Sequence, residues 1–289
     1  MAQPLKFDVI VGNPPYQGSA GNGSQSLWPK FINLDLQLLQ EQGQLLQVTP
    51  ASWLGNLHSS NWRHMLTRNI QQVQPCAEHF PGVGSTFCWW QLRNEPSTGS
   101  TRVGPCTTVD LSQLPMLPVR QQEWPLVQRL LTTLGQRLPW HKGPQPGWGT
   151  RAESRQPSAL YPWRVVRRGS EIVWVGGAEP PHHQVPKVVL AVSRADIQPT
   201  YYPDPITAFP GTMAWTPMPD AEQAHRLIQL LNHPVYRYLL AAHKYLGWQP
   251  VAVFRYVPVW LDRDLTSEQV WDQFGVSDQE RSHIMAYRA

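Results

Sequence analysis

Cysteines and long apolar runs are both scarce in this chain. The 289 residues include only Cys76, Cys88 and Cys106, an odd number with no C-x-x-C spacing. A disulfide framework and a structural zinc site are therefore not expected, and a reducing cytosol fits best. No run approaches the roughly 18 apolar residues of a membrane span, and the opening MAQPLKFD lacks the apolar core of a signal peptide.

Charge is also sparse, whereas proline and tryptophan are abundant. Charged residues make up 15% of the chain and hydrophobic residues 41%, a balance that permits a packed core and argues against wholesale disorder. The net charge of +4 is compatible with a nucleic-acid partner without requiring one. The 29 prolines predict many loops and few long helices.

The N-terminal region alternates between strand and helix patterns. Residues 7–11 are short, apolar and β-branched, residues 27–39 have helical periodicity, and residues 44–50 are a second apolar run. A strand, a helix and a strand in this order predict a βαβ unit with a parallel sheet and a right-handed crossover. Further along, we predict a second helix at residues 62–73 and an aromatic strand at residues 85–94.

The texture of the sequence changes after residue 95. Residues 96–219 are rich in Pro, Trp, Arg and Gly, with short strand candidates, which predicts an irregular and mostly β region. Residues 220–289 return to helical patterns and contain capping boxes that begin at Thr266 and Ser277. We therefore expect an α/β region over residues 1–95, the irregular β region, and a helical C-terminal region.

The first strand runs directly into Asn-Pro-Pro-Tyr, residues 13–16. Proline fixes φ and has no N–H, so this corner offers carbonyl acceptors, and the residue before a proline is driven into extended geometry that aims Asn13 outward. The Asn13 amide oxygen and the Pro14 carbonyl suit an NH₂ group on a planar ring, on which Tyr16 can stack. We therefore predict amine methylation by positioning, with Asn13, Pro14, Pro15 and Tyr16 as the catalytic corner and no metal. The alternative is that NPPY is an ordinary turn.

This corner resembles motif IV of the amino-methyltransferases that use S-adenosylmethionine. The segment LWPKFINLDLQLLQEQGQLLQVTPASWL, residues 27–54, is similar to the helix and strand that follow motif IV in adenine-N6 DNA methyltransferases of restriction–modification systems. FPGVGSTFCWWQLRN, residues 80–94, resembles their motif VIII region, and residues 253–280 resemble their ending. The resemblance covers residues 6–94 and 212–284.

The resemblance implies a partial Rossmann-like methyltransferase sheet and a specific reaction. A flipped adenine would be held by Asn13, the Pro14 carbonyl and Tyr16, with direct methyl transfer from S-adenosylmethionine to N6. Asn13 would also contact the cofactor. An aromatic residue of the motif VIII region helps to hold the base in that family, and Phe87 matches it best, with Trp89 and Trp90 as alternatives. The implied partner is DNA, in the cytoplasm of a bacterial or phage-infected cell.

Arginines gather where the resemblance places target recognition, and Tyr161 and Trp163 lie between them. Arginines contact phosphates and guanine edges, and aromatic rings stack on bases. The alternative is a solvated arginine face. Trp140 and Lys142 suggest the same role more weakly, and the adjacent His182 and His183 are more typical of a loop than of a metal site. The candidate DNA-contacting residues are Arg151, Arg155, Arg164, Arg167 and Arg168.

The glycine-rich cofactor half of the family precedes motif IV and does not fit before Asp8. The F-x-G-x-G match at residues 80–84 is rejected because it precedes a strand instead of joining a strand to a helix. Residues 7–11 would then form an apolar sheet edge, open to pairing with a second chain. The chain is interpreted as a fragment, one half of a split enzyme, or a repurposed relative.

Two other functions remain open at this stage. One is a catalytically inactive DNA-binding or specificity protein derived from a methyltransferase. The other is a protein-glutamine N-methyltransferase, because a carboxamide NH₂ requires the same acceptors. Such enzymes end soon after the methyltransferase fold, so the roughly 200 residues that follow residue 94 favour DNA as the substrate.

Overall fold

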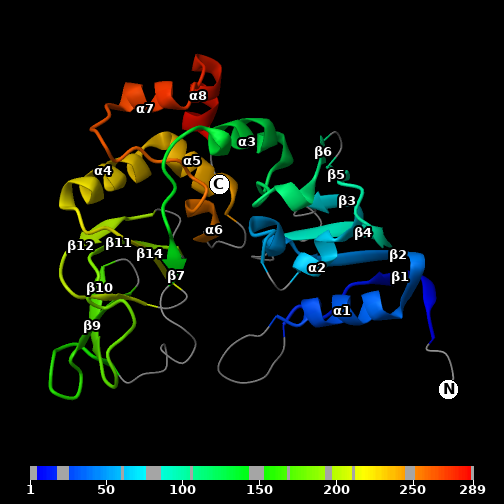
Figure 1. The fold of residues 1–289 in the computed structure, drawn as a ribbon, viewed down its shortest axis with the longest axis horizontal. Helices are drawn as coiled ribbons and strands as arrows, with labels where there is room; N and C mark the ends of the chain where they lie inside the picture. Colours follow the sequence, from blue (N-terminus) through cyan, green and yellow to red (C-terminus); the bar gives the residue numbers. More distant parts are fainter. Residues whose placement is uncertain are drawn as a thin grey trace. The chain divides into compact units, whose positions relative to one another are not determined.

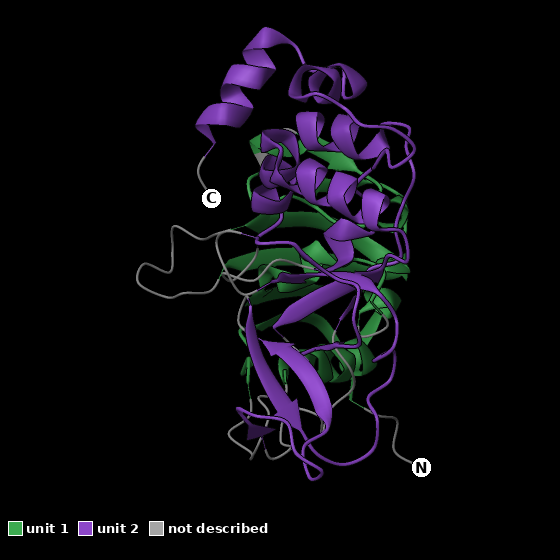
Figure 2. Cartoon of the chain, turned by 90° about the vertical axis from the view of Figure 1, so that its left-hand side faces the viewer, with its two compact units in different colours: residues 1–124 green, residues 125–289 purple. Residues whose placement is uncertain are grey.

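The fold is known from a computed structural model in which the chain forms two compact units, Met1–Trp124 and Pro125–Ala289 (Figure 2). The boundaries after residues 95 and 219, which the sequence predicts between three regions, stay predictions. The structure describes residues 5–17, 26–59, 62–75, 86–104, 107–142, 153–167, 170–192, 197–209, 212–244 and 251–287.

Unit 1 is built on a six-stranded mixed sheet with the order β1-β2-β4-β3-β5-β6 (Figure 1). β1 and β2 are parallel and joined through α1, so the predicted βαβ unit is confirmed. β4 is antiparallel to both of its neighbours, β2 and β3. The bounds are β1 Phe7–Gly12, α1 Trp28–Leu38, β2 Leu39–Pro50, β3 Arg68–Pro75, β4 Phe87–Pro96, β5 Thr101–Val103 and β6 Thr107–Val109.

Helix α1 packs on one face of this sheet. Pro29 stands in the first turn, where a missing N–H costs nothing, and Trp28 and Ile32 are buried. Along β2, the residues that face the helix side alternate with exposed ones, as Leu45, Gln47 and Thr49 are buried while Leu46 is 36% exposed. Burial of this single face therefore sets the register of β2 against β1.

The prediction of a helix over residues 62–73 was wrong for most of its length. Only Arg63–Leu66 is helical, as α2, and the chain then enters β3. β3 pairs with β4 on one side and with β5 on the other, and its Ile70 and Val73 are buried. Backbone pairing on both sides outweighs a local pattern that fits a helix, because strand formation depends on neighbours distant in sequence.

β1 is the terminal strand of the six-stranded sheet and is widely exposed. Its apolar side chains Phe7, Val9 and Val11 are 40%, 58% and 69% exposed. Val11 pairs with Leu46, so exposed apolar side chains continue from the edge strand onto the face opposite α1. The prediction that residues 7–11 form an apolar edge is confirmed for the described residues.

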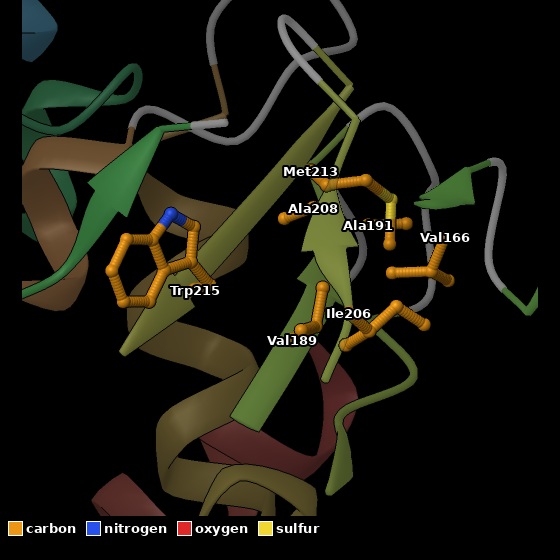
Figure 3. Packing of buried hydrophobic residues seen from close by; sticks show 7 residues of the cluster. All are labelled: Val166, Val189, Ala191, Ile206, Ala208, Met213 and Trp215. Atoms are coloured by element: carbon orange, nitrogen blue, oxygen red, sulfur yellow. The ribbon is translucent and has the colours of Figure 1, made fainter. Parts of the chain in front are cut away.

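Unit 2 begins with two four-stranded sheets, of order β13-β9-β10-β8 and β12-β11-β14-β7. A shared cluster of buried residues joins them: Val166, Val189, Ala191, Ile206, Ala208, Met213 and Trp215 (Figure 3). The bounds are β7 His141–Lys142, β8 Glu153–Ser154, β9 Trp163–Arg167, β10 Glu171–Val175, β11 Lys187–Ala191, β12 Thr200–Tyr202, β13 Thr207–Ala208 and β14 Met213–Pro217.

Short helices precede and follow these sheets in the chain and complete the predicted α/β fold class. Asp220 accepts hydrogen bonds from two backbone amides at the start of α4, and both predicted capping boxes, from Thr266 and Ser277, are present. The helices are α3 Trp124–Thr132, α4 Ala221–Asn232, α5 Pro234–Ala242, α6 Val251–Phe254, α7 Ser267–Gln273 and α8 Asp278–Ala286. Unit 1 also contains 3₁₀ turns at Ala51–Gly55, Leu111–Gln113 and Gln121–Glu123.

Gly12, the last residue of β1, lies directly against the side chain of its strand partner Gln47. A Cβ at position 12 would stand 2.7 Å from Gln47 Nε2 and 2.8 Å from Gln47 Oε1. Gln47 is 2% exposed, and its Nε2 donates to Asp35 Oδ2 at 2.8 Å. Because Gln47 is held on its far side by α1, position 12 has no room for a side chain.

We predict that Gly12→Ala lowers the free energy of unfolding by about 1 to 3 kcal/mol, because it overpacks this contact. The cost should shrink in a Gln47→Ala background, where the clashing amide is gone. Urea denaturation of the two single variants and the double variant measures the coupling. Strictly additive effects would show that the Gly12–Gln47 contact is not the cause.

Histidine 243 is a buried, neutral group at the end of α5. Its Nδ1 lies 2.7 Å from the Leu239 carbonyl oxygen, and its Nε2 is buried without a partner among the described residues. Burial lowers the pKa of His243 to about 4. The unfolded chain therefore binds a proton more readily than the folded chain as the pH falls below about 6.5.

Acidification should accordingly destabilise the protein through His243. The free energy of unfolding should fall by about 2 kcal/mol between pH 7 and pH 5 on account of this residue, because the proton favours the unfolded state. In His243→Leu this part of the loss should disappear, whereas the exposed His225→Leu should retain it. Urea denaturation at both pH values tests this, and equal losses in the two variants would contradict it.

Candidate active site

The Asn-Pro-Pro-Tyr corner lies at the carboxyl end of β1, the position at which open α/β sheets bind ligands. Asn13 and Pro15 are exposed, and Pro14 and Tyr16 are half-buried. The Tyr16 hydroxyl donates a hydrogen bond to Asn13 Oδ1. The Tyr16 carbonyl accepts from the Leu27 amide at 3.0 Å, which ties the corner to the start of α1.

Phe87 meets this corner because of the strand directions. β4 is antiparallel to β2, and Phe87, its first residue, pairs with Pro50, the last residue of β2. The start of β4 therefore lies at the same edge of the sheet as the end of parallel β1. The rings of Tyr16 and Phe87 are 5.0 Å apart, centroid to centroid, with 40° between their planes. The structure thus brings together two aromatic residues that are far apart in sequence.

The two alternatives to Phe87 have different surroundings. Trp90 is completely buried, its Nε1 donates to Thr49 Oγ1 at 3.1 Å, and its ring contacts Trp53 edge-on. It is therefore a core residue. Trp89 is half-buried. By the alternation of strand side chains, it lies on the face of β4 opposite to that of Trp90.

A buried polar pair, Asp35 and Gln47, supports the corner from behind. Gln47 touches Gly12, the residue before Asn13, and burial raises the pKa of the Asp35 carboxyl to which it donates. Gln47 Oε1 is buried with no hydrogen-bond partner among the described residues. Our sequence analysis missed this pair. The available signal was a glutamine in the buried phase of an otherwise apolar strand.

The geometry gives the corner a hydrogen-bond acceptor with remaining capacity. A carboxamide oxygen has two lone pairs, and the Tyr16 hydroxyl uses one of them at Asn13 Oδ1. The other lone pair and the Pro14 carbonyl are acceptors, whereas the two prolines supply no N–H. An amine on a flat ring matches this set.

Within the described part of the chain, no three His, Cys, Asp or Glu side chains gather as a metal site would require. The same residues include no helix with the length and hydropathy needed to cross a membrane. The F-x-G-x-G match at residues 80–84 lies outside the described residues.

The candidate arginines of unit 2 have unequal environments. Arg167 is held by two carboxylates, Glu153 at 2.5 Å and Glu171 at 3.2 Å. Arg164 is half-buried on β9. Burial lowers the pKa of His183, and Lys187 and Arg164 lower it further, whereas burial raises the pKa of Tyr202 against the opposing effect of Arg164. Arg155 is exposed. Arg151 and Arg168 lie outside the described residues.

The weaker candidates also separate. Trp140 is 2% exposed and packs on Phe254 with ring centroids 5.0 Å apart, so it belongs to the core. Lys142 is exposed on β7. His182 is exposed in the turn before β11, whereas His183 is buried, with its Nδ1 2.9 Å from Thr207 Oγ1.

The N-terminal part of unit 1 is similar in sequence to known methylases. Residues 2–74 match the Eco57I restriction-modification methylase family. A relative from Mycoplasma pneumoniae, an uncharacterized adenine-specific methylase, is 42% identical over 55 residues, which are 17% of this chain and 13% of that protein.

Solved structures of restriction-modification enzymes are similar to this chain at low sequence identity. MmeI, a Type IIL enzyme in complex with DNA, has a TM-score of 0.44 and 11% identity, covering 87% of this chain and 45% of its own. LlaBIII, an ATP-dependent Type ISP enzyme bound to DNA, has a TM-score of 0.42 and 9% identity, covering 89% of this chain and 28% of its own. The chain thus spans less than half the length of each of these relatives.

The match covers β1, the NPPY corner, α1 and β2, and it ends at Gln74 within β3. The segment that carries the candidate corner is therefore the one whose sequence is shared. Residues 2–74 are thus similar to the Eco57I restriction-modification methylase family, in agreement with the resemblance to restriction–modification methyltransferases expected from the corner.

Proposed function

We propose that this chain takes part in methylation of adenine N6 in DNA, with S-adenosylmethionine as the methyl donor. One observation carries the proposal: Asn13 and Tyr16, in the segment that matches the methylase family, meet Phe87 at the carboxyl end of β1. The acceptors fit the N6 amine, and the two rings fit the flat face of a base.

The corner would act by positioning the amine. Asn13 Oδ1 and the Pro14 carbonyl accept the two N6 hydrogens, which turns the nitrogen lone pair away from conjugation with the ring. Tyr16, already packed on Phe87, provides a wall against which the base stacks. S-adenosylmethionine would supply an electrophilic methyl group when bound. As the N–C bond forms, the S–C bond would break, S-adenosylhomocysteine would leave, and N6 would give up one proton to solvent.

The described residues fit the base better than the whole cofactor. Asn13 is the residue that we assign to both, because it stands where the amine and the methyl group must meet. In dinucleotide sites of related sheets, an acidic residue holds the ribose hydroxyls. Neither strand of the parallel pair β1–β2 is followed by one, since β1 leads into Asn13 and β2 into Ala51.

The remaining cofactor contacts would come from a segment that pairs with β1. Edge strands with exposed apolar side chains invite pairing, and Val9 and Val11 are both more than half exposed. A further parallel strand beside β1 would cover this edge and bring its own carboxyl end next to Asn13. We propose that this segment, a second chain in a split enzyme, contributes the cofactor half of the site.

The DNA itself would be contacted by unit 2. Arg155 and Arg164 are the candidates in the described part of the chain for which no ion pair with a carboxylate is given above. Arg151 and Arg168 belong to the same predicted set. Arg167, with its two carboxylate partners, would join the sheet strands rather than reach a phosphate.

A second candidate function is DNA binding without catalysis. The open edge of β1 favours it, because among the described residues no strand pairs with this edge to complete a cofactor site beside Asn13. The two functions separate experimentally when the chain is supplied with S-adenosylmethionine and with cell extract that contains its partners.

In the presence of the second chain that supplies the cofactor half, we expect Asn13→Ala to lower adenine methylation by about 100-fold or more, because it removes the acceptor aimed at the amine. Asn13 is exposed and its side chain contacts Tyr16, so DNA binding and thermal stability should stay at the wild-type level. Tyr16→Phe is the matched control, since it removes the same internal hydrogen bond but keeps the ring. Loss of folding in Asn13→Ala would make Asn13 structural and sink its catalytic assignment.

We also expect S-adenosylmethionine not to bind the purified chain alone at micromolar strength. Calorimetric titration of S-adenosylmethionine into the folded chain measures this, with far-UV circular dichroism as the check on folding. Addition of a fraction that contains the proposed second chain should restore binding. Micromolar binding by the chain alone would instead locate a complete cofactor site within residues 1–289.

A further inference from the structure

Unit 2 contains a buried lysine that no described carboxylate neutralises. Lys187, the first residue of β11, is 1% exposed. Its Nζ donates to the carbonyl oxygens of His182, at 2.5 Å, and Ile206, at 2.6 Å. Burial lowers the pKa of Lys187 to about 8, so most of the molecules still carry the charge at pH 7. Burying a full positive charge costs free energy unless hydrogen bonds or an opposite charge compensate for the lost hydration.

Three aromatic rings lie between this charge and the surface. Lys187 Nζ is 5.1 Å from the centre of the Trp215 ring. His141 stacks on Trp215 at 4.6 Å and His182 packs on it at 5.2 Å, centroid to centroid. Trp215 is 6% exposed, His141 is half-buried and His182 is exposed, so the two imidazoles form the outer layer.

The strand register explains this arrangement. His141 of β7 pairs directly with Trp215 of β14, and residues opposite each other in an antiparallel pair project to the same face. Val189 pairs with Trp215, so Lys187, two residues before it on β11, shares that face. Figure 3 shows the Trp215 ring apart from the other labelled side chains, with its nitrogen towards β7, where the Lys142 carbonyl accepts its hydrogen at 3.2 Å.

The third ring is held in place by an unusual backbone conformation. His182 has a φ of 60°, in the left-handed region that residues other than glycine seldom adopt. Its carbonyl accepts the hydrogen bond from Lys187 Nζ. The buried cation thus fixes the turn that presents the His182 ring.

The surroundings of the three rings are mainly cationic. Burial lowers the pKa of His141, and Arg255 and His182 lower it further. Arg255 is exposed, and its Nε donates to the Trp140 carbonyl at 2.9 Å. On the neighbouring turn, Glu179 accepts a hydrogen bond from Gln184 at 2.6 Å. An anion at the two imidazoles would therefore meet a positive field from beneath and from one side.

We propose that His141 and His182, backed by Trp215 and Lys187, form a contact for a phosphate of duplex DNA. This rests on the proposed function, because it adds a second DNA-contacting surface to unit 2 in addition to Arg155 and Arg164. The imidazole N–H groups donate to the phosphate oxygens, and the buried ammonium supplies charge through one ring layer. The geometry of a fixed, rigid stack makes this a positioning contact that is independent of base sequence.

The test is fluorescence anisotropy of a labelled duplex with the full chain, over a series of salt concentrations. The double variant His141→Ala with His182→Ala should bind about tenfold more weakly and with a shallower salt dependence, since it loses donors to a charged oxygen. His225→Ala, an exposed histidine on α4 of the same unit, is the matched control and should bind like the wild type.

A second variant removes the charge instead of the rings. Lys187→Met keeps the length of the side chain and should also weaken DNA binding several-fold in protein that melts at the wild-type temperature. If Lys187→Met does not fold, the histidine pair alone decides. Equal binding by the histidine double variant and His225→Ala would overturn the inference, whereas a wild-type chain that binds no DNA would overturn the proposed function itself.

Discussion

The pairing of β2 with both a parallel and an antiparallel strand is the constraint on which the candidate active site depends. β1 runs alongside β2 in the same direction, and β4 runs against it, so the end of one neighbour and the beginning of the other meet at one edge. Phe87 reaches Tyr16 for this reason. No local feature of the corner would bring Phe87, which lies 71 positions after Tyr16 in the chain, to its ring.

The corner could be predicted from sequence because its chemistry is local. An apolar strand that ends in two prolines leaves few conformations, and the residue types state which atoms are offered. The same holds for the capping boxes at Thr266 and Ser277, which depend on four consecutive residues. β3 was mistaken for a helix because its identity depends on partners elsewhere in the chain. Gln47 was overlooked because its importance lies in what it touches.

The arginines and the buried lysine show the same division within unit 2. A run of arginines is visible in the sequence, but which of them are free depends on carboxylates such as Glu153 and Glu171, whose positions only the sheet reveals. Lys187 attracts no attention in the sequence, since a lysine at the start of a strand is ordinarily solvated. Its register beside Trp215 is what places a charge below a layer of rings.

The hydrogen bond between Tyr16 and Asn13 has a consequence for selectivity. Without a substrate, the Asn13 oxygen already has a donor on the same chain, so it does not rely on ordered water for its satisfaction. A group that offers a single hydrogen can use either the remaining Asn13 lone pair or the Pro14 carbonyl, but not both. A guest with two hydrogens on one nitrogen can reach the second lone pair and the proline carbonyl together. The proposed site would therefore bind an amine that carries two hydrogens more strongly than a group that carries one.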